Sequence, residues 1–192
     1  MSVPLLTTEG AVLECIMVSI GWDPAPDLVP MDATELDAGA PDVVSGRADL
    51  NIAALSFSGD QLVDAVYHEN LTSLDGSVRH TGDNLTGEGA GDNEVIVADL
   101  SRIADQVTSV FLVITSYTAR TFADVPNAYC HIVDAGSTLE IARYSLTGGP
   151  HTAVVVGKLA RDPRSWEFTG IGLGVAATHV AETVGYLGPY LP

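Results

Sequence analysis

A glycine-rich segment at residues 82–94, GDNLTGEGAGDNE, concentrates the side chains that could do chemistry in this chain. Its carboxylate and amide oxygens come from Asp83, Asn84, Glu88, Asp92, Asn93 and Glu94. A hard cation such as Ca²⁺ takes roughly six to eight oxygen ligands of these kinds, including backbone carbonyls that glycines can turn inward. Ordering so many glycines costs conformational entropy, and the clustered carboxylates repel one another. A bound cation would offset both costs, so the segment predicts part of a cation site.

The strand-like sequence DLNIAALSF could supply the rest of this site. Asp49 and Asn51 are two positions apart, so both side chains would point to the same face of a strand. Two oxygen ligands on a rigid strand edge would complement the flexible glycine-rich segment. In a later loop, Asn70 and Asp75 are further oxygen-bearing candidates, although Asp75 followed by Gly76 is also typical of a β-turn.

The glycine-rich segment differs from an EF-hand. Residues 83–94 have the length of an EF-hand loop and are acidic at both ends. However, Leu85 and Gly87 occupy the third and fifth positions, where EF-hands place oxygen-bearing side chains. The flanking sequences predict strands rather than helices. A loop that joins two strands is therefore the better description.

The elements that must hold these residues are mostly short β-strands. Alternating and β-branched apolar stretches recur between Gly, Pro, Asp and Ser residues, which is typical of strands joined by turns. The predicted strands are 11–22, 49–57, 94–100, 109–118, 128–135, 139–146, 152–160 and 166–174. Residues 175–187 are the best helix candidate, and residues 99–110 could hold one short helical turn capped by Ser101. The pattern predicts an all-β fold with minor helix, either a β-sandwich or a β-barrel.

Together these motifs resemble the tellurium-resistance TerD-like (TerD domain) stress-protein family. The resemblance rests, in chain order, on VSIGWD, DLN, LDGSVRHTGDNLTGEGAGDNEVIVADLS, NAYCHIVD, EIARYSL and WEFTGIGLG. It covers most of the chain, and it implies a two-sheet β-sandwich with cation-binding loops at one end and Ca²⁺ as the bound ion. The metal ligands that it implies are Asp49, Asn51, Asp83, Asn84, Gly87, Gly89, Asp92 and Glu94.

Two positions depart from the family pattern. The second strand aspartate is Asn51 here, and the often acidic position after Asp92 is Asn93. Fewer ligand charges imply a lower cation affinity or fewer bound ions. A Pro/Asp-rich loop at 24–46 is also longer than the family usually carries. If it folded over the site, it could contribute Asp27, Asp32, Asp37 or Asp42.

The composition indicates a single domain over residues 1–192 and restricts its partners. Acidic residues number 25 against 8 basic ones, which gives a net charge of −17. This balance disfavours nucleic acid and anionic membrane surfaces, because both need a cationic patch. No apolar run approaches the roughly 20 residues of an integral membrane helix. The N-terminus does not resemble a signal peptide, so a soluble cytoplasmic protein is expected.

The cysteines and tryptophans are expected in the core. Cys15 and Cys130 lie far apart in apolar stretches and have no metal-binding spacing, so they are predicted as buried free thiols. Trp22 and Trp166 also lie in apolar strand sequences, where core packing is their commoner role.

Three functions are compatible with these features. The resemblance implies a calcium-binding, non-catalytic protein linked to tellurite and general stress resistance, in which Ca²⁺ orders a surface for protein partners of a stress-response assembly. A metal-dependent hydrolase could use the same acidic loop, with His80 beside it, but no nucleophile elbow or zinc-protease motif is present. A structural assembly module with a weakened Ca²⁺ site is the third. The sequence leaves the oligomeric state open.

Overall fold

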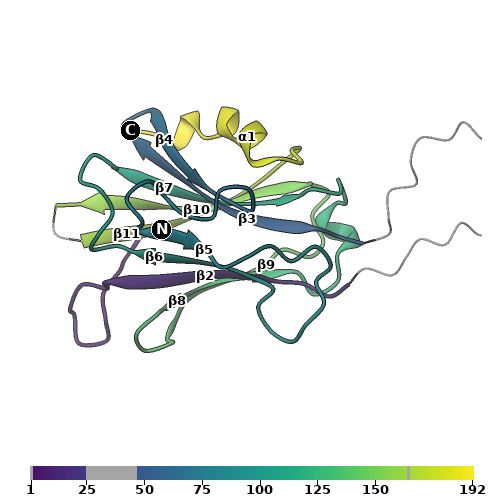
Figure 1. Cartoon of the computed structure of the whole chain (residues 1–192), viewed down its shortest axis with the longest axis horizontal. Coiled ribbons are helices and arrows are strands. Elements are labelled where there is room, and N and C mark those ends of the chain that lie inside the picture. The colour runs from purple at the N-terminus through teal and green to yellow at the C-terminus, as the bar shows by residue number, and fades with distance from the viewer. Residues whose placement is uncertain (1, 25–46, 164) are drawn as a thin grey trace, which may run out of the picture.

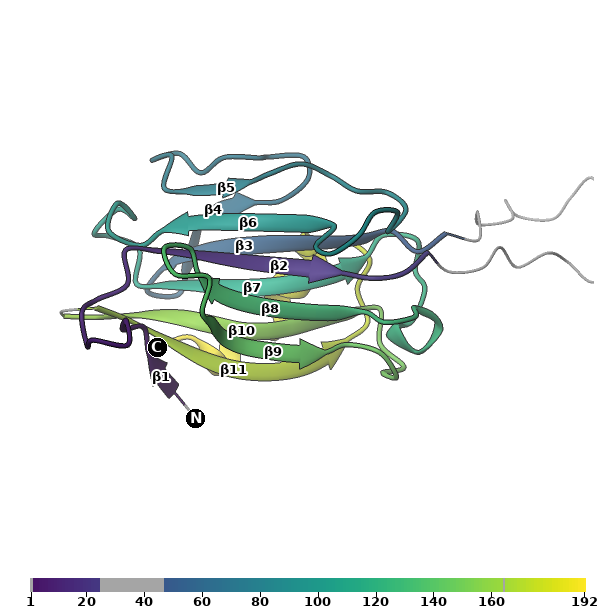
Figure 2. The same cartoon turned by 90° about the horizontal axis from the view of Figure 1, so that it is seen from below.

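The computed structural model describes residues 2–24, 47–163 and 165–192. Its strands form two antiparallel sheets that pack face to face (Figures 1 and 2). The predicted two-sheet β-sandwich with minor helix is therefore confirmed. Most of the predicted loop at 24–46 lies outside the described residues, and so do the four aspartates that it was expected to offer.

One sheet has six strands in the order β1-β11-β10-β7-β3-β4. These strands are β1 (Ser2–Pro4), β3 (Leu50–Ser58), β4 (Gln61–Val66), β7 (Ser109–Ser116), β10 (Ala153–Asp162) and β11 (Ser165–Val175). The other sheet has five strands in the order β5-β6-β2-β8-β9. They are β2 (Cys15–Gly21), β5 (Val78–His80), β6 (Glu94–Asp99), β8 (Tyr129–Asp134) and β9 (Glu140–Ser145).

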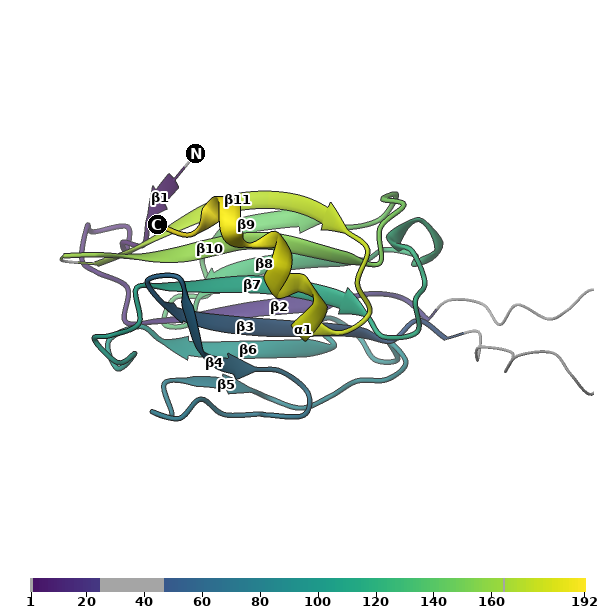
Figure 3. The same cartoon turned by 90° about the horizontal axis from the view of Figure 1, so that it is seen from above.

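The burial of each strand follows from what covers its two faces. Along β6 burial alternates, so every second side chain faces the core between the sheets. Along β3 and β7 nearly every side chain is buried, because the C-terminal segment covers the outer face of the six-stranded sheet (Figure 3). Val180 and Leu187 of this segment pack on Phe57 and Phe111 of the sheet.

The C-terminal segment contains less α-helix than the predicted 175–187. It forms α1 (Val180–Thr183) and two 3-10 turns, η2 (Val184–Tyr186) and η3 (Gly188–Tyr190). A capping box starts α1: His179 Nδ1 accepts from Ala181 N, and the Glu182 carboxylate accepts from His179 N. Histidine is not among the usual N-cap residues, so the start of this helix carries no strong signal in the sequence.

The structure corrects two further sequence predictions, for Ser101 and Cys15, and confirms one, for Cys130. Residues 100–106 form turns, and within this described stretch there is no helical turn capped by Ser101. A 3-10 helix, η1 (Phe122–Asp124), lies instead between β7 and β8. Cys130 is buried as predicted, whereas Cys15 is only half-buried.

The two tryptophans occupy the core, as predicted, and Trp22 and Trp166 are each 3% exposed. No helix among the described residues is long and apolar enough to cross a membrane.

One end of the sandwich gathers the elements that carry the predicted ligands. β2 ends there, β3 begins there, and the glycine-rich loop leads from β5 into β6 at the same end (Figure 2). Strand pairing sets this arrangement, because Ile20 near the end of β2 lies opposite Glu94 at the start of β6. The fold thus brings both halves of the predicted site to one end.

Candidate cation site

The start of β3 provides two buried oxygen-bearing side chains. Asp49 is 8% exposed and Asn51 is 4% exposed. Asn51 Nδ2 donates a hydrogen bond to Asp49 Oδ1 at 2.7 Å, which confirms that the two side chains share one face of the strand. The Oδ1 atom of Asn51 is buried and has no hydrogen-bond partner among the described residues. A buried amide oxygen without a donor is unfavourable unless a ligand approaches it.

Asp83, in the glycine-rich loop, lies near enough to Asp49 for the two carboxylates to repel each other. Burial, and after it repulsion from the Asp83 carboxylate, raises the pKa of Asp49 above its ordinary value. The hydrogen bond from Asn51 and the nearby ring of His68 act in the opposite direction and do not outweigh them. Asp83 is itself exposed. The structure therefore brings together three of the predicted ligands, two of them mutually repelling carboxylates.

Glu94 lies behind the loop, with no exposed surface. One of its oxygens, Oε2, accepts from Ile52 N at 2.9 Å and contacts His80 Nε2 at 3.2 Å. The other oxygen, Oε1, accepts from Asn84 N at 3.1 Å. Burial raises the pKa of Glu94, although these hydrogen bonds oppose the rise. Its oxygens are thus bonded to protein donors rather than directed at Asp83.

The central part of the loop is organised by Asn84. Its Oδ1 accepts from Gly87 N at 3.0 Å and from Thr86 N at 3.1 Å, while its Nδ2 donates to Glu88 O at 3.2 Å. The Asn84 side chain therefore closes a turn of the loop, as asparagine commonly does. A cation would have to compete with these backbone donors for Oδ1.

Positive φ angles and a close contact with Trp22 explain why two positions of the loop are glycine. Gly87 and Gly89 have φ angles of +72° and +125°. A Cβ atom on Gly87 would also lie 2.4 Å from Nε1 of Trp22, so the loop rests directly on that indole. Trp22 Nε1 in turn donates to the carbonyl of Ala48, next to Asp49. The predicted role of the two glycines as carbonyl ligands remains a prediction.

Asp92 lies on a different surface from Asp83. Its carboxylate accepts from the hydroxyl of Tyr129 at 2.9 Å and lies 3.0 Å from Nε2 of His131, both on β8. Burial raises the pKa of Asp92, but the hydrogen bonds from His131, Tyr129 and Ser19 outweigh it and lower the pKa overall. The structure thus does not bring Asp92 to the Asp49 cluster.

Asn93 has a structural role. Its Oδ1 accepts from Trp22 N at 2.8 Å, and its own N donates to Ile20 O at 2.8 Å. These bonds fasten the end of the loop to β2. The side chain of Asn93 therefore serves as a hydrogen-bond acceptor for the backbone of Trp22.

Two histidines beside the site were not predicted as part of it. His80, at the end of β5, is 4% exposed and bonded to Glu94. His68 lies near Asp49, and its Nδ1 is buried with no hydrogen-bond partner among the described residues. The sequence shows only that His80 lies two residues before the glycine-rich segment that begins at Gly82. The sequence carries no signal for His68, because its approach depends on how β4 meets β3.

The composition of the cluster limits how it could hold an ion. In the described part of the chain, no group of three or more histidine, cysteine, aspartate or glutamate side chains could hold a metal ion. The Asp49 cluster instead combines two carboxylates with one amide oxygen. Calcium also accepts backbone carbonyls and water as ligands, so a cation here would draw on those to complete its shell.

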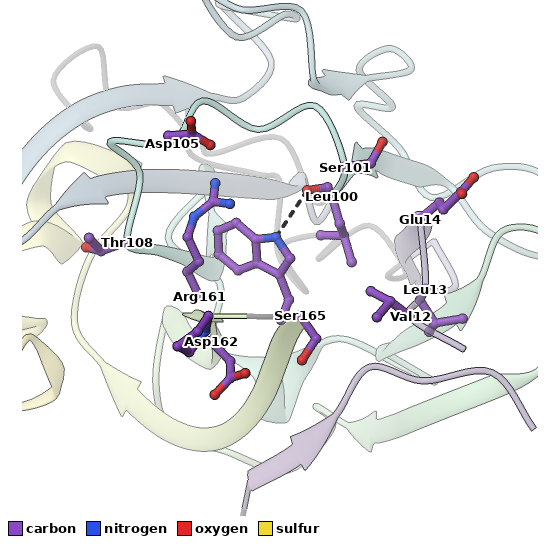
Figure 4. Close-up of a pocket in the computed structure, with 12 residues that line it drawn as sticks. Val12, Leu13, Glu14, Leu100, Ser101, Asp105, Thr108, Arg161, Asp162 and Ser165 are labelled. Carbon is purple, nitrogen blue, oxygen red and sulfur yellow. Dashed lines mark hydrogen bonds between the residues drawn. The ribbon is translucent and has the colours of Figure 1, made fainter. Parts of the chain in front are cut away.

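A hollow of about 770 Å³ lies at the opposite end of the sandwich (Figure 4). Its polar groups serve the fold: Trp166 Nε1 donates to Leu100 O at 3.1 Å, and Arg161 stacks on the Trp166 ring at 4.4 Å. Arg161 also donates to the carbonyls of Ile103 and Val107. The predicted ligands all lie at the other end.

Comparison with known proteins places the chain among related sequences. A family model described as the TerD domain matches residues 3–184. Tellurium resistance protein TerZ from Serratia marcescens is 35% identical over 175 residues, which cover 87% of this chain and 83% of TerZ. Stress response protein SCP2 from Bacillus subtilis is 29% identical over 188 residues, which cover 93% of this chain and 92% of SCP2.

A solved structure shares the fold. The crystal structure of a homologue of telluride resistance protein (TerD) from Streptomyces coelicolor A3(2) superposes with a TM-score of 0.73. It is 22% identical and covers 90% of this chain and 95% of the other.

Proposed function

This chain belongs to the TerD domain family, which is linked to tellurium and stress resistance, and from that premise we propose that it is a calcium-binding, non-catalytic protein. In this proposal Ca²⁺ binds at one end of the sandwich, between the start of β3 and the glycine-rich loop. The bound ion orders the acidic loop into a surface that protein partners contact.

The observation that carries the proposal is the arrangement of Asp49, Asn51 and Asp83. Two carboxylates repel each other across a site that also holds a buried amide oxygen without a donor. A divalent cation removes the repulsion and supplies a partner for the Asn51 oxygen. Both effects favour the bound state without any rearrangement of β3. Hard oxygen ligands of this kind suit Ca²⁺ better than a thiophilic metal.

The non-catalytic part of the proposal is supported by the hydrogen bonds of His80 and His131. The side chain of His80 has no exposed surface and is bonded to Glu94. His131 is bonded to Asp92 on the outer face of β8. A general base for hydrolysis must reach a substrate proton, and neither of these two imidazoles is placed to do so at the Asp49 cluster. His68 is the histidine near Asp49, and its Nδ1 is buried.

Calorimetric titration of chelator-treated protein with Ca²⁺, with and without excess Mg²⁺, tests the proposal. We expect saturable Ca²⁺ binding that survives Mg²⁺ and is lost in the Asp49→Asn Asp83→Asn double variant. Asp60→Asn is a matched control, because Asp60 is an exposed aspartate in the turn after β3, at the opposite end. Absence of binding by the unmodified protein, or full binding by the double variant, would contradict the assignment.

A further inference from the structure

We propose that Glu94 and His80 form a positioning pair for the cation site, which holds Asp83 opposite Asp49 and Asn51 without touching the ion. The inference rests on the calcium-binding function proposed above and goes beyond it. It also changes the role of Glu94, which the family resemblance implies to be a ligand. In this structure Glu94 acts through the backbone that carries the ligands.

Glu94 joins the two halves of the site. The side chains of Glu94 and His80 are both fully buried, with 0% exposure. On the strand side, Glu94 Oε2 accepts from Ile52 N at 2.9 Å. The pairing of β3 with β4 runs only from Ser58 back to Ala54, so Ile52 lies beyond the last paired residue of that edge. The Glu94 carboxylate provides the acceptor that the neighbouring strand does not.

The loop side is held by both members of the pair. Glu94 Oε1 accepts from Asn84 N at 3.1 Å, and His80 Nδ1 accepts from Gly82 N at 3.2 Å. Gly82 and Asn84 are the residues immediately before and after Asp83. The backbone of Asp83 is therefore fixed on both sides, and the Asp83 carboxylate lies near enough to Asp49 to raise the pKa of Asp49.

The donor from Gly82 fixes the tautomer of His80. A backbone N–H can only donate, so Nδ1 of His80 carries the lone pair and Nε2 carries the hydrogen. Nε2 lies 3.2 Å from Glu94 Oε2 and donates to it. Each hydrogen bond in the chain from Gly82 through His80 to Glu94 then has one donor and one acceptor. A side chain that cannot both accept from Gly82 and donate to Glu94 breaks this chain.

The same bonds argue against direct ligation by Glu94. Its carboxylate already accepts from two backbone amides and one imidazole, and the bonds from Ile52 N and His80 are buried. These donors use three of the roughly four lone-pair positions of a carboxylate, and only Oε1 keeps one. An ion bound through both oxygens would displace a donor, and buried N–H groups without acceptors are rare in native proteins. Changing a residue that orients a metal ligand through a hydrogen bond typically lowers metal affinity about 10- to 100-fold.

Terbium luminescence separates a positioning role from a ligand role. Tb³⁺ occupies oxygen-rich Ca²⁺ sites, and we expect Trp22, which packs against the loop at Gly87, to sensitise its emission. Luminescence decay in H₂O and D₂O gives the number of water molecules on the bound Tb³⁺. The number rises when a protein ligand is removed and stays constant when a positioning residue is changed.

We expect Glu94→Gln and His80→Leu each to weaken Tb³⁺ and Ca²⁺ binding by about tenfold or more, with the water number unchanged. Asp83→Asn is the ligand control, and it should abolish binding or add water to the ion. An additional water in Glu94→Gln, or unchanged affinity in both variants, would overturn the positioning role.

A measurement on the unmodified protein covers the case in which Glu94→Gln does not fold. Amide hydrogen exchange by NMR should show Ile52 and Asn84 protected without Ca²⁺ and at least as protected with it. Loss of protection at Ile52 when Ca²⁺ binds would show that Glu94 leaves its donors to bind the ion, which contradicts this inference alone. Failure of the unmodified protein to bind either ion would contradict the proposed function as well.

Discussion

The hydroxyl group of Tyr129 donates a hydrogen bond to Asp92 at 2.9 Å, and this contact keeps Asp92 on the outer face of the five-stranded sheet. Asp83, from the same glycine-rich loop, acts electrostatically on Asp49 instead. The loop thus serves two surfaces. Only one of its two aspartates is available to the proposed site as the structure stands.

The first prediction separates these two aspartates. We expect Asp83→Asn to lower Ca²⁺ affinity at least about tenfold, because ligand charge tunes affinity. Asp92→Asn and Tyr129→Phe should each change the Ca²⁺ affinity less than about twofold. Asp92 does not bind the ion in this proposal, and salt screens the charge of a carboxylate that lies away from the site. Calorimetry at physiological salt measures all three. Equal losses in Asp83→Asn and Asp92→Asn would mean that Asp92 leaves Tyr129 to bind the ion.

The second prediction concerns the contact between the loop and Trp22. Gly87→Ala introduces a Cβ that would lie 2.4 Å from the Trp22 indole nitrogen, at a φ of +72°. Gly91→Ala is a matched control, because its φ of +90° is also positive but a Cβ there meets nothing within 4 Å. Backbone strain costs each variant about 1 kcal/mol. The clash should cost Gly87→Ala a further 1–3 kcal/mol or so.

Urea unfolding and Trp fluorescence measure this difference. We expect a shifted Trp22 emission only in Gly87→Ala, since the indole must move to admit the methyl group. Equal destabilisation of both variants, with unshifted emission, would show that the loop does not rest on Trp22.

The fold could be predicted from the sequence because strand burial leaves a periodic signal. β6 shows this well: Ile96 and Ala98 face inward while Val95 and Val97 are half-buried. The edge strands β1 and β5 are missed by the sequence analysis because three residues carry too little periodicity, and β4 is missed because its first three residues are all exposed and do not alternate. The α-helix was overestimated because its apolar face also suits the 3-10 turns that follow it.

The candidate site was harder to predict than the fold. The i, i+2 spacing of Asp49 and Asn51 fixes a shared face, and the structure bears this out. No such rule gives the direction of a side chain in a loop. The sequence therefore cannot show which of Asp83 and Asp92 lies near Asp49. Glu94 did carry a usable signal. It shares the alternation of Ile96 and Ala98, which places its carboxylate in the core.

The third prediction follows from the titration of Asp49. Burial, and then the Asp83 carboxylate, raises the pKa of Asp49 above its ordinary 3.8. The folded protein therefore holds this proton more tightly than the unfolded chain does, and stability falls as the pH rises through the raised pKa. Without Ca²⁺, Asp49→Asn should be more stable than the unmodified protein at neutral pH.

This advantage should disappear as the pH falls through the raised pKa towards 3.8, because Asp49 then becomes neutral as well. Urea midpoints between neutral pH and pH 4, in chelator, give the measurement. The exposed control Asp60→Asn should show no such advantage at neutral pH. A variant of Asp49 that is less stable at neutral pH in chelator would mean that its carboxylate is stabilised in the folded state without any cation.

The last prediction restores the charge that this chain lacks. Asn51→Asp removes the amide that donates to Asp49 and places a second carboxylate beside it, so the calcium-free protein should lose stability. The added ligand charge should tighten Ca²⁺ binding by about tenfold, which adds about 1.4 kcal/mol of stabilisation at saturating Ca²⁺. The rise in Tm on adding Ca²⁺ should therefore exceed that of the unmodified protein. Gln61→Glu adds the same charge at an exposed position of β4 and should leave the rise unchanged. A rise no larger in Asn51→Asp than in Gln61→Glu would mean that residue 51 does not face the ion.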